Sequence, residues 1–332
     1  MTDLLVLPDD DRCVVAREDG GALTEVWRAG IYPTPFIPSE ELRALHRIKA
    51  HEGGWVSDAD QSVRFYRLRE DRLALAYTAS LPELRPYAVA MRGDAVFIAG
   101  VGRGKRGERE ALFVSDGALG PDTKFRPVEI PDSLRWHDRK GIDALVFDGD
   151  TLIAVDNVYA PLYFLIYDVR DPHAPRLVRT VEFQYPGSGE EVIAATMGTC
   201  LAVLTCFYDR TRVHLYERDT FTEYGYLDLG KFEEPESMWR SMVFSGDHLY
   251  VAAGPAGVGR VNVSEALSEH RRKRDRWRTW GQEAGLCYPE LDYTPAPSGG
   301  SVCFITKGRG GLYLHTPGRG GARSEWLPIE GG

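Results

Sequence analysis

The residues best suited to chemistry in this sequence are acids and a histidine that stand where apolar, strand-like runs begin. Asp143, Glu190 and Asp292 fall near the starts of such runs in three different parts of the chain. Carboxylate oxygens are the ligands that Ca²⁺ and similar hard cations prefer, so these three acids are candidate metal ligands. His137 stands beside Asp138, and this pair could serve as the acid/base element of a hydrolase or lyase.

A second group of residues at comparable positions is suited to recognition rather than to catalysis. Tryptophan, tyrosine and arginine side chains are typical of the centres of protein–protein interfaces. The candidates are Arg85, Tyr87, Trp136, Arg139, Glu191, Trp239, Arg240 and Tyr288. We expect them to form a binding rim at the mouth of a central channel.

One strongly basic segment lies in a chain whose formal net charge is −9. It falls within the stretch Ser264 to Trp280, which has helical character, and its first cations are Arg271, Arg272, Lys273 and Arg274. Two interpretations stay open at this point. The segment is either a solvated helix face, or a docking patch for an acidic partner or a nucleic-acid backbone.

Known nucleotide-binding and catalytic motifs do not fit. The run Gly102–Gly107 has the letters of a dinucleotide fingerprint, but charges and another strand follow it where a helix is required. No Ser or Thr follows Lys105, as a P-loop requires, and no Gly-x-Ser-x-Gly element is present. The Gly-Arg-Gly-Gly runs at Gly308 and Gly318 are interpreted as turns. We therefore expect no cofactor, with Ca²⁺ as the alternative.

A repeat with a period of about fifty residues must position these side chains. In each unit a short turn opens an apolar strand, a further strand precedes the turn, and two more follow. The turns are Gly93-Asp94, Gly149-Asp150, Gly198-Thr199, Gly246-Asp247 and Gly299-Gly300. Four short strands in each unit predict an all-β fold, a single β-propeller of six blades with four antiparallel strands per blade.

The repeat is less regular before Pro86. Arg12–Ala16 and the hairpin over 63–77 are expected to form a sixth blade, split by an insertion over residues 29–61. That insertion holds a Pro-rich piece and a short predicted helix, Glu40 to Ala50. If Leu23–Trp27 belongs to a separate blade, the count becomes seven. We assign residues 1–332 to one domain, with a basic helical insertion over 264–280 in a late blade.

One unit resembles a known bacterial repeat. Gly149–Asp156 is followed by Leu165–Arg170 and then by Asp171-Pro172-His173-Ala174-Pro175. This order of a Gly-Asp turn, a strand ending in Asp, a strand ending in Asp-Val and an Asp-Pro-x-x-Pro turn resembles the LVIVD repeat of β-propellers. Arg260–Ser264 resembles the same strand end in part, with Asn262-Val263 in place of Asp-Val. LVIVD propellers are similar to WD40 and kelch proteins, so the resemblance implies a recognition module.

The composition bears on the classes of partner and on the cellular location of the protein. The excess of acidic residues disfavours general binding to nucleic acid or to anionic membranes. The N-terminus lacks the basic region of a signal peptide, and no apolar run approaches the ~20 residues that span a bilayer. The odd number of scattered cysteines is typical of reduced, buried thiols. These features favour a cytoplasmic protein.

The function favoured by these observations is a non-enzymatic recognition module or scaffold that binds another protein through the propeller rim or channel mouth. The alternative is a metal-dependent hydrolase or lyase that acts on a small molecule in the central channel. A membrane partner is not expected, and a nucleic-acid partner is disfavoured.

Overall fold

The computed structural model describes the residues 4–9, 12–19, 22–30, 49–51, 54–59, 62–69, 72–80, 84–104, 107–117, 120, 122–131, 142–156, 162–183, 191–207, 210–230, 241–279, 289–302, 304–316 and 323–329. Within these ranges the chain forms β-strands joined by turns, together with one long helix. Two compact units are present, one made of residues 1–33 and 193–332 and the other of residues 34–192.

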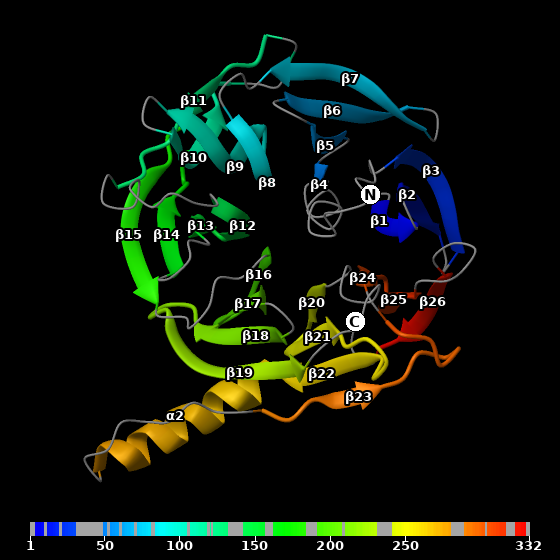
Figure 1. Cartoon of the computed structure of the whole chain (residues 1–332), viewed down its shortest axis with the longest axis vertical. Coiled ribbons are helices and arrows are strands. Elements are labelled where there is room, and N and C mark those ends of the chain that lie inside the picture. The colour runs from blue at the N-terminus through cyan, green and yellow to red at the C-terminus, as the bar shows by residue number, and fades with distance from the viewer. Residues whose placement is uncertain are drawn as a thin grey trace. The chain divides into compact units, whose positions relative to one another are not determined.

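The described part of unit 34–192 contains three four-stranded antiparallel sheets (Figure 1). Their strands are β4 (Lys49–His51), β5 (Gly54–Ala59), β6 (Ser62–Arg69) and β7 (Arg72–Ser80); β8 (Leu84–Arg92), β9 (Ala95–Gly104), β10 (Gly107–Ser115) and β11 (Phe125–Pro127); and β12 (Ile142–Asp148), β13 (Thr151–Asp156), β14 (Leu162–Asp168) and β15 (Arg176–Phe183). Each strand pairs with its neighbours in the sequence, which is the order of strands in a propeller blade.

In the described part of the other unit, each strand again pairs with its neighbours in the sequence. Two of its sheets have four strands and two have three. Its strands are β1 (Leu4–Asp9), β2 (Arg12–Asp19) and β3 (Ala22–Gly30); β16 (Glu191–Met197), which begins at the boundary, β17 (Cys200–Phe207), β18 (Arg210–Glu217) and β19 (Thr222–Gly230); β20 (Met242–Ser245), β21 (His248–Ala252), β22 (Val258–Asn262) and β23 (Asp292–Thr294); and β24 (Phe304–Gly308), β25 (Gly311–Thr316) and β26 (Arg323–Pro328). The helix α2 (Val263–Thr279) lies between β22 and β23 in the sequence.

Three Gly-Asp pairs and the pair Gly198-Thr199 make the tight turn between the first and second strands of four sheets. Gly93, Gly149, Gly198 and Gly246 all have φ between 52° and 58°. Arg92 pairs with Ala95 and Asp148 with Thr151, which leaves two residues in each loop. A positive φ at the first of two loop residues is typical of a type II′ hairpin turn and favours glycine there. The sequence repeat is therefore a repeat of turn geometry.

The second residue of each of three such turns also hydrogen-bonds the chain at the end of the third strand of its sheet. Its carbonyl oxygen accepts a hydrogen bond from a backbone N–H just beyond that strand: Val169 N to Asp150 O at 2.8 Å, Arg218 N to Thr199 O at 2.9 Å and Val263 N to Asp247 O at 3.0 Å. Val169 and Val263 are both buried. The Asp-Val and Asn-Val strand ends thus share one structural role.

Each unit has its own apolar core. In unit 34–192, side chains from β8–β10 pack against side chains from β12–β14, with Phe97 and Phe147 edge to face at 5.5 Å. In the other unit, the sheets β16–β19 and β20–β23 share a core that also includes Ala266 and Leu267 of α2. Burial of this kind contributes about 25 cal/mol for each Å² of apolar surface, and it is what holds neighbouring sheets together.

The structure corrects two expectations for the irregular parts of the chain. Arg12–Ala16 and the hairpin over 63–77 do not share a blade: β4 and β5 pair with β6, whereas Arg12–Ala16 lies in the separate sheet β1–β3. The described residues form seven sheets, the number expected if Leu23–Trp27 belongs to a separate blade. Gly299-Gly300 precedes the first strand of the last sheet, and Arg309-Gly310 makes its first hairpin turn. Most of the helix predicted over Glu40 to Ala50 lies outside the described residues, and its last two residues belong to β4.

Candidate functional surfaces

Helix α2 begins where the third strand of its sheet ends. Asn262 Oδ1 accepts hydrogen bonds from the backbone N–H groups of Ser264 and Glu265, both at 3.1 Å, and so caps the helix. Glu265 places a negative charge in the first turn, which complements the helix dipole. The Ser264 hydroxyl lies 3.2 Å from Asp247 Oδ1 in the Gly-Asp turn below it. The local sequence therefore fixes both the start of α2 and its direction.

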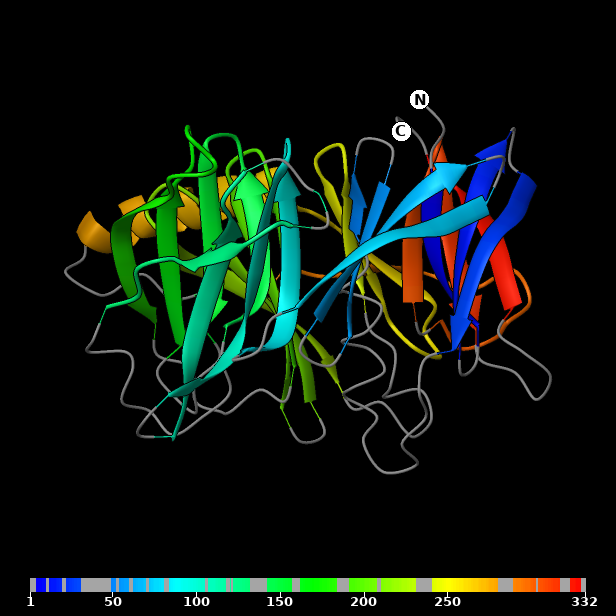
Figure 2. The same ribbon diagram turned by 90° about the horizontal axis from the view of Figure 1, so that it is seen from above.

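One face of the first half of α2 is buried. Val263, Ala266, Leu267 and His270 recur at helical spacing, and each is at most 5% exposed. The His270 ring lies 6.0 Å from the ring of Tyr224 on β19. Figure 1 shows that α2 extends from this anchorage away from β22, and Figure 2 shows it running across the strand direction. The helix is thus fixed at its first half and projects with its second.

The second half of α2 is the basic segment. It carries six cations, Arg271, Arg272, Lys273, Arg274, Arg276 and Arg278, and one acid, Asp275. Arg271 donates hydrogen bonds to Glu217 Oε1, one of them over 3.1 Å, and the Glu217 side chain is only 12% exposed. Lys273 Nζ lies 2.7 Å from Glu269 Oε1, one turn earlier. Arg272 is exposed. Two of the four predicted patch residues therefore have acidic partners. The i,i+4 spacing of Glu269 and Lys273 could have indicated one of them, whereas the contact of Arg271 with Glu217 spans 54 residues and could not be predicted.

Acidic and phenolic side chains gather at one end of the sheet β12–β15. Asp143 is the extra residue of a β-bulge, because Ile142 pairs with Asp156 and Ala144 with Val155. Asp156 is fully buried, and Tyr163 lies opposite both Asp156 and Glu182 in the ladder. Burial raises the pKa of Tyr163, and the nearby charges of Glu182 and Asp156 raise it further. Among the described residues, no three His, Cys, Asp or Glu side chains are grouped to hold a metal ion.

The described residues among the other candidates lie on three different sheets. Arg85 and Tyr87 lie on β8 and Glu191 is the first residue of β16, all on the first strands of their sheets. Asp292 lies on β23, the last strand of its sheet, where its carboxylate accepts a hydrogen bond from Arg260 at 3.2 Å. Trp136, His137, Asp138, Arg139, Glu190, Trp239, Arg240 and Tyr288 lie outside the described residues.

Polar residues of the LVIVD-like segment 149–175 connect two sheets of unit 34–192. His173 Nδ1 lies 3.0 Å from the carbonyl oxygen of Ser115, and His173 Nε2 lies 3.1 Å from Asp94 Oδ1. In the opposite direction, Arg92 donates to the Gly149 carbonyl and to Asp150. These four side chains therefore connect the Gly-Asp turns of neighbouring sheets. Sequence reading identified the turns but not these connections.

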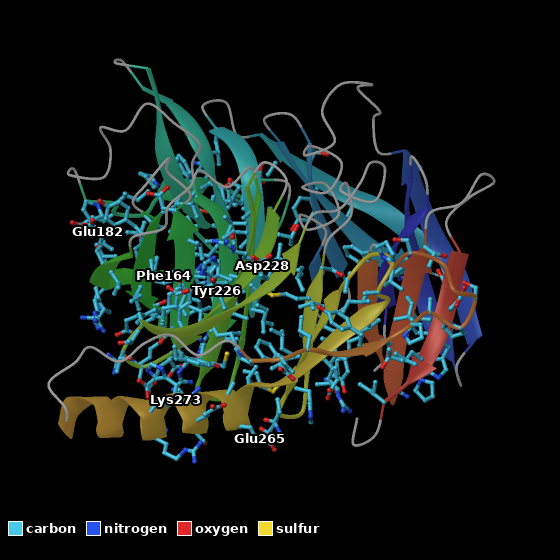
Figure 3. The ribbon with its side chains drawn as sticks, turned by 60° about the horizontal axis from the view of Figure 1, so that its bottom comes forward. Phe164, Glu182, Tyr226, Asp228, Glu265 and Lys273 are labelled. Atoms are coloured by element: carbon cyan, nitrogen blue, oxygen red, sulfur yellow. The ribbon has the colours of Figure 1, made fainter. Side chains whose placement is uncertain are left out.

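A second set of charged and aromatic side chains lies on β18 and β19. His214 Nδ1 is 2.7 Å from Glu223 Oε1, and the Arg212 guanidinium lies 5.0 Å above the ring centre of Tyr226. Arg212 Nε is also 3.4 Å from Asp228 Oδ2. Figure 3 labels Tyr226 and Asp228, two residues apart on β19. The cross-strand pairing of β18 with β19 accounts for this arrangement, and it stabilises the outer part of the sheet.

The comparisons with known proteins give a fold but no family. No family model matches the chain, and the search of curated proteins finds no relative. Among solved structures, the chain is similar to Kuenenia stuttgartiensis hydrazine synthase, with TM-score 0.61, 12% identity and coverage of 96% of this chain and 90% of that one. It is also similar to a putative 6-phosphogluconolactonase from Bacteroides uniformis, with TM-score 0.53, 14% identity and coverage of 99% and 98%.

A third solved structure, Chaetomium thermophilum Sqt1, has TM-score 0.53 at 14% identity, over 92% of this chain and 74% of that one. At such low identity these likenesses bear on the fold alone. Together with the antiparallel sheets in sequence order, they identify the fold as a β-propeller. In the described part of the chain, no helix is both long and apolar enough to cross a bilayer.

Proposed function

We propose that this chain is a non-enzymatic recognition module that binds another protein through the rim of its propeller, with α2 as part of the binding surface. The observation that carries the proposal is the placement of α2. The sheet β20–β23 pairs its strands in the same order as the sheets that have no helix, so the strand order does not require α2. The helix nevertheless has its own cap, its own buried face and a projecting charged end.

The use of charged side chains within the sheets supports the same proposal. Arg92, His173 and Asp168 all make polar contacts with residues of their own or the next sheet, Asp168 with both Arg170 and Arg176. These charged side chains already have partners within the sheets, whereas Arg272 on the projecting helix is exposed. The proposal includes a cytoplasmic location, which fits the buried free thiol of Cys200.

The test is affinity capture from the native host, followed by reconstitution from purified components. We expect a partner in stoichiometric amount that rebinds the purified chain and that excess untagged chain displaces. The matched control is the same tagged chain after thermal denaturation, which keeps its charge and composition but loses its surface. If no stoichiometric partner is recovered, or if recovered candidates fail to rebind once purified, the proposed function is wrong.

A second candidate function is a metal-dependent hydrolase or lyase. It is favoured by Asp143 and Asp156, which lie at the same end of one sheet across the Ile142–Asp156 pair. In this function Asp143 would supply an oxygen ligand to Ca²⁺, and His137 with Asp138 would act as acid or base. Asp292, on the last strand of its sheet and paired with Arg260, is not a ligand in this proposal.

Metal dependence can be measured by thermal unfolding in Ca²⁺ and in EDTA. A bound ion stabilises the folded state by mass action, by about 2.7 kcal/mol at one hundred times its dissociation constant. Asp143→Asn should abolish that gain, whereas Asp219→Asn, at an exposed turn, should leave it intact. Identical midpoints in Ca²⁺ and EDTA for the unaltered chain would remove the metal-dependent function.

A further inference from the structure

The cations of α2 differ in what they already contact. Arg271 reaches 54 residues back along the chain to Glu217, and Lys273 pairs with Glu269 on the helix itself. Arg272 lies between them in the sequence, and its side chain is exposed. Arg271 therefore positions the helix, whereas Arg272 is presented to solvent.

The basic segment is short, and its charge opposes that of the rest of the chain. Residues 271–278 span about 12 Å along a helix axis, at 1.5 Å for each residue. They contribute six cations and one anion to a chain total of −9, so the remainder of the chain carries a net −14. A negatively charged ligand is thus attracted to this segment and repelled by the rest of the molecule.

We infer that the C-terminal half of α2, residues 271–279, docks an acidic segment of the partner protein. This inference rests on the proposed function. Charge complementarity identifies the occupant as an anion, and the short span favours a polypeptide. Double-stranded DNA carries one charge every ~1.7 Å and would extend its charge beyond the 12 Å patch over the acidic remainder. An acidic segment of a protein can place a few carboxylates within the patch and end there.

The helix is suited to this role because its anchorage and its binding surface are separate. Val263, Ala266, Leu267 and His270 hold the first half in the core, and Glu217 holds Arg271 at the start of the basic run. A partner that contacts the projecting half therefore binds a helix that is already folded. Binding to a preformed element avoids the entropy cost of ordering it.

The test uses a fluorescent decaglutamate peptide as the probe and the full chain as the protein. Arg272→Ser should weaken binding about two- to fivefold, the effect of removing one exposed ion pair of ~0.4–1 kcal/mol. Lys307→Ser is the matched control, because it removes one exposed cation on β24 and should change nothing. Glu269→Gln should strengthen binding about twofold, since it removes the carboxylate charge 2.7 Å from the Lys273 ammonium. Circular dichroism checks that each variant keeps its helix.

Salt provides a second readout. Raising the salt concentration from 0.1 M to 1 M shortens the Debye length from ~10 Å to ~3 Å and should abolish peptide binding. The inference is overturned if decaglutamate does not bind, or if Arg272→Ser and Lys307→Ser weaken it equally. Tighter binding of a decathymidylate than of the peptide would also overturn it and assign the surface to nucleic acid.

The outcomes for the inference and for the proposed function are separable. If a captured partner binds Arg272→Ser and Glu269→Gln as tightly as the unaltered chain, α2 is not the docking element and the proposed function survives. If no partner is captured although decaglutamate binds at Arg272, the anion site exists and the proposed function fails.

Discussion

The connection through His173 makes a prediction about pH. Both acceptors of the ring, the Ser115 carbonyl and Asp94 Oδ1, lie within 3.1 Å of a ring nitrogen. A neutral imidazole has one N–H and can donate to only one of them, whereas the imidazolium donates to both. The hydrogen bond to Ser115 raises the pKa of His173, burial opposes this, and Asp94 and then Asp171 raise it further. The geometry therefore fits the protonated form.

The sign of the pH dependence follows from this shift. Because the folded-state pKa is raised above the unfolded value of ~6.5, the stabilisation is fully present below pH 6.5 and is lost as the pH rises through the folded-state pKa. A hydrogen bond to a charged group contributes about 1.5–3 kcal/mol when buried. The His173 and Asp94 side chains are 30% and 60% exposed, so we discount the loss to about 0.5–1 kcal/mol.

The assay compares the unaltered chain with His173→Gln by hydrogen exchange at pH 5.5 and pH 8.5. Exchange of the segments 93–96 and 171–174 should be two- to fivefold faster in the variant at pH 5.5, and this ratio should shrink at pH 8.5. Taking the ratio at each pH removes the intrinsic pH dependence of exchange. His248→Gln, a partly exposed histidine in the other unit, is the control. An equal ratio at both pH values would refute the argument that the ring is doubly protonated.

The remaining predictions concern α2, a close backbone contact and a thiol. Asn262→Ala should cost about 1 kcal/mol in urea unfolding and lower the helical circular dichroism signal, whereas Asn262→Asp should retain the cap. Arg271→Ser should lower the free energy of unfolding by about 0.5–1 kcal/mol in the same assay, because it removes the ion pair with the nearly buried Glu217. Arg272→Ser, at an exposed position, should change that free energy by no more than about 0.5 kcal/mol. Gly257→Ala should destabilise the fold by more than ~1 kcal/mol, because φ is +90° and a Cβ would lie 2.2 Å from the Thr294 carbonyl oxygen; a wild-type melting temperature would contradict this. Burial raises the pKa of the Cys200 thiol to about 11, so mass spectrometry should find it unalkylated by iodoacetamide at pH 8 in the native chain and alkylated after unfolding.

The regular part of the fold could be predicted because its signals are local. A glycine at the first position of a two-residue loop, flanked by apolar runs, specifies a hairpin without reference to distant residues. Four of the five predicted turns occupy that position in the structure. The fifth predicted turn, Gly299-Gly300, lies before the first strand of the last sheet. The first hairpin turn of that sheet is made one strand later, by Arg309-Gly310.

The N-terminal sheets were harder to predict because nothing local distinguishes an insertion from a strand. Gly54–Ala59 contains Ser57 and Asp58 and has no apolar alternation, yet it pairs along its whole length with β6. Strand pairing of this kind depends on the neighbouring strand rather than on intrinsic propensity. The sequence therefore predicted six blades with seven as the alternative, and the described residues form seven sheets.

The candidate surfaces were predictable as segments but not as sets of contacts. The basic run of α2 is evident in the sequence, whereas its contact with Glu217 depends on how the helix packs on β19. Likewise, the Asp-Pro-x-x-Pro turn is visible as a motif, but the contact of His173 with Asp94 spans 79 residues. Ion pairs between distant segments follow from the docking of sheets, which single-sequence patterns do not encode.

The junction after the third strand of a sheet can accept an inserted segment, as the ends of β14 and β22 illustrate. In one sheet Asp168 Oδ1 accepts the N–H of Arg170 and the chain turns at Pro172; in another Asn262 Oδ1 accepts the N–H of Ser264 and a helix of seventeen residues follows. Both ends keep a buried valine whose N–H binds the Gly-Asp turn. The same junction therefore tolerates either a short reversal or a long appendage without disturbing the sheet. It is a natural position at which to graft a binding helix onto a blade, or to remove one.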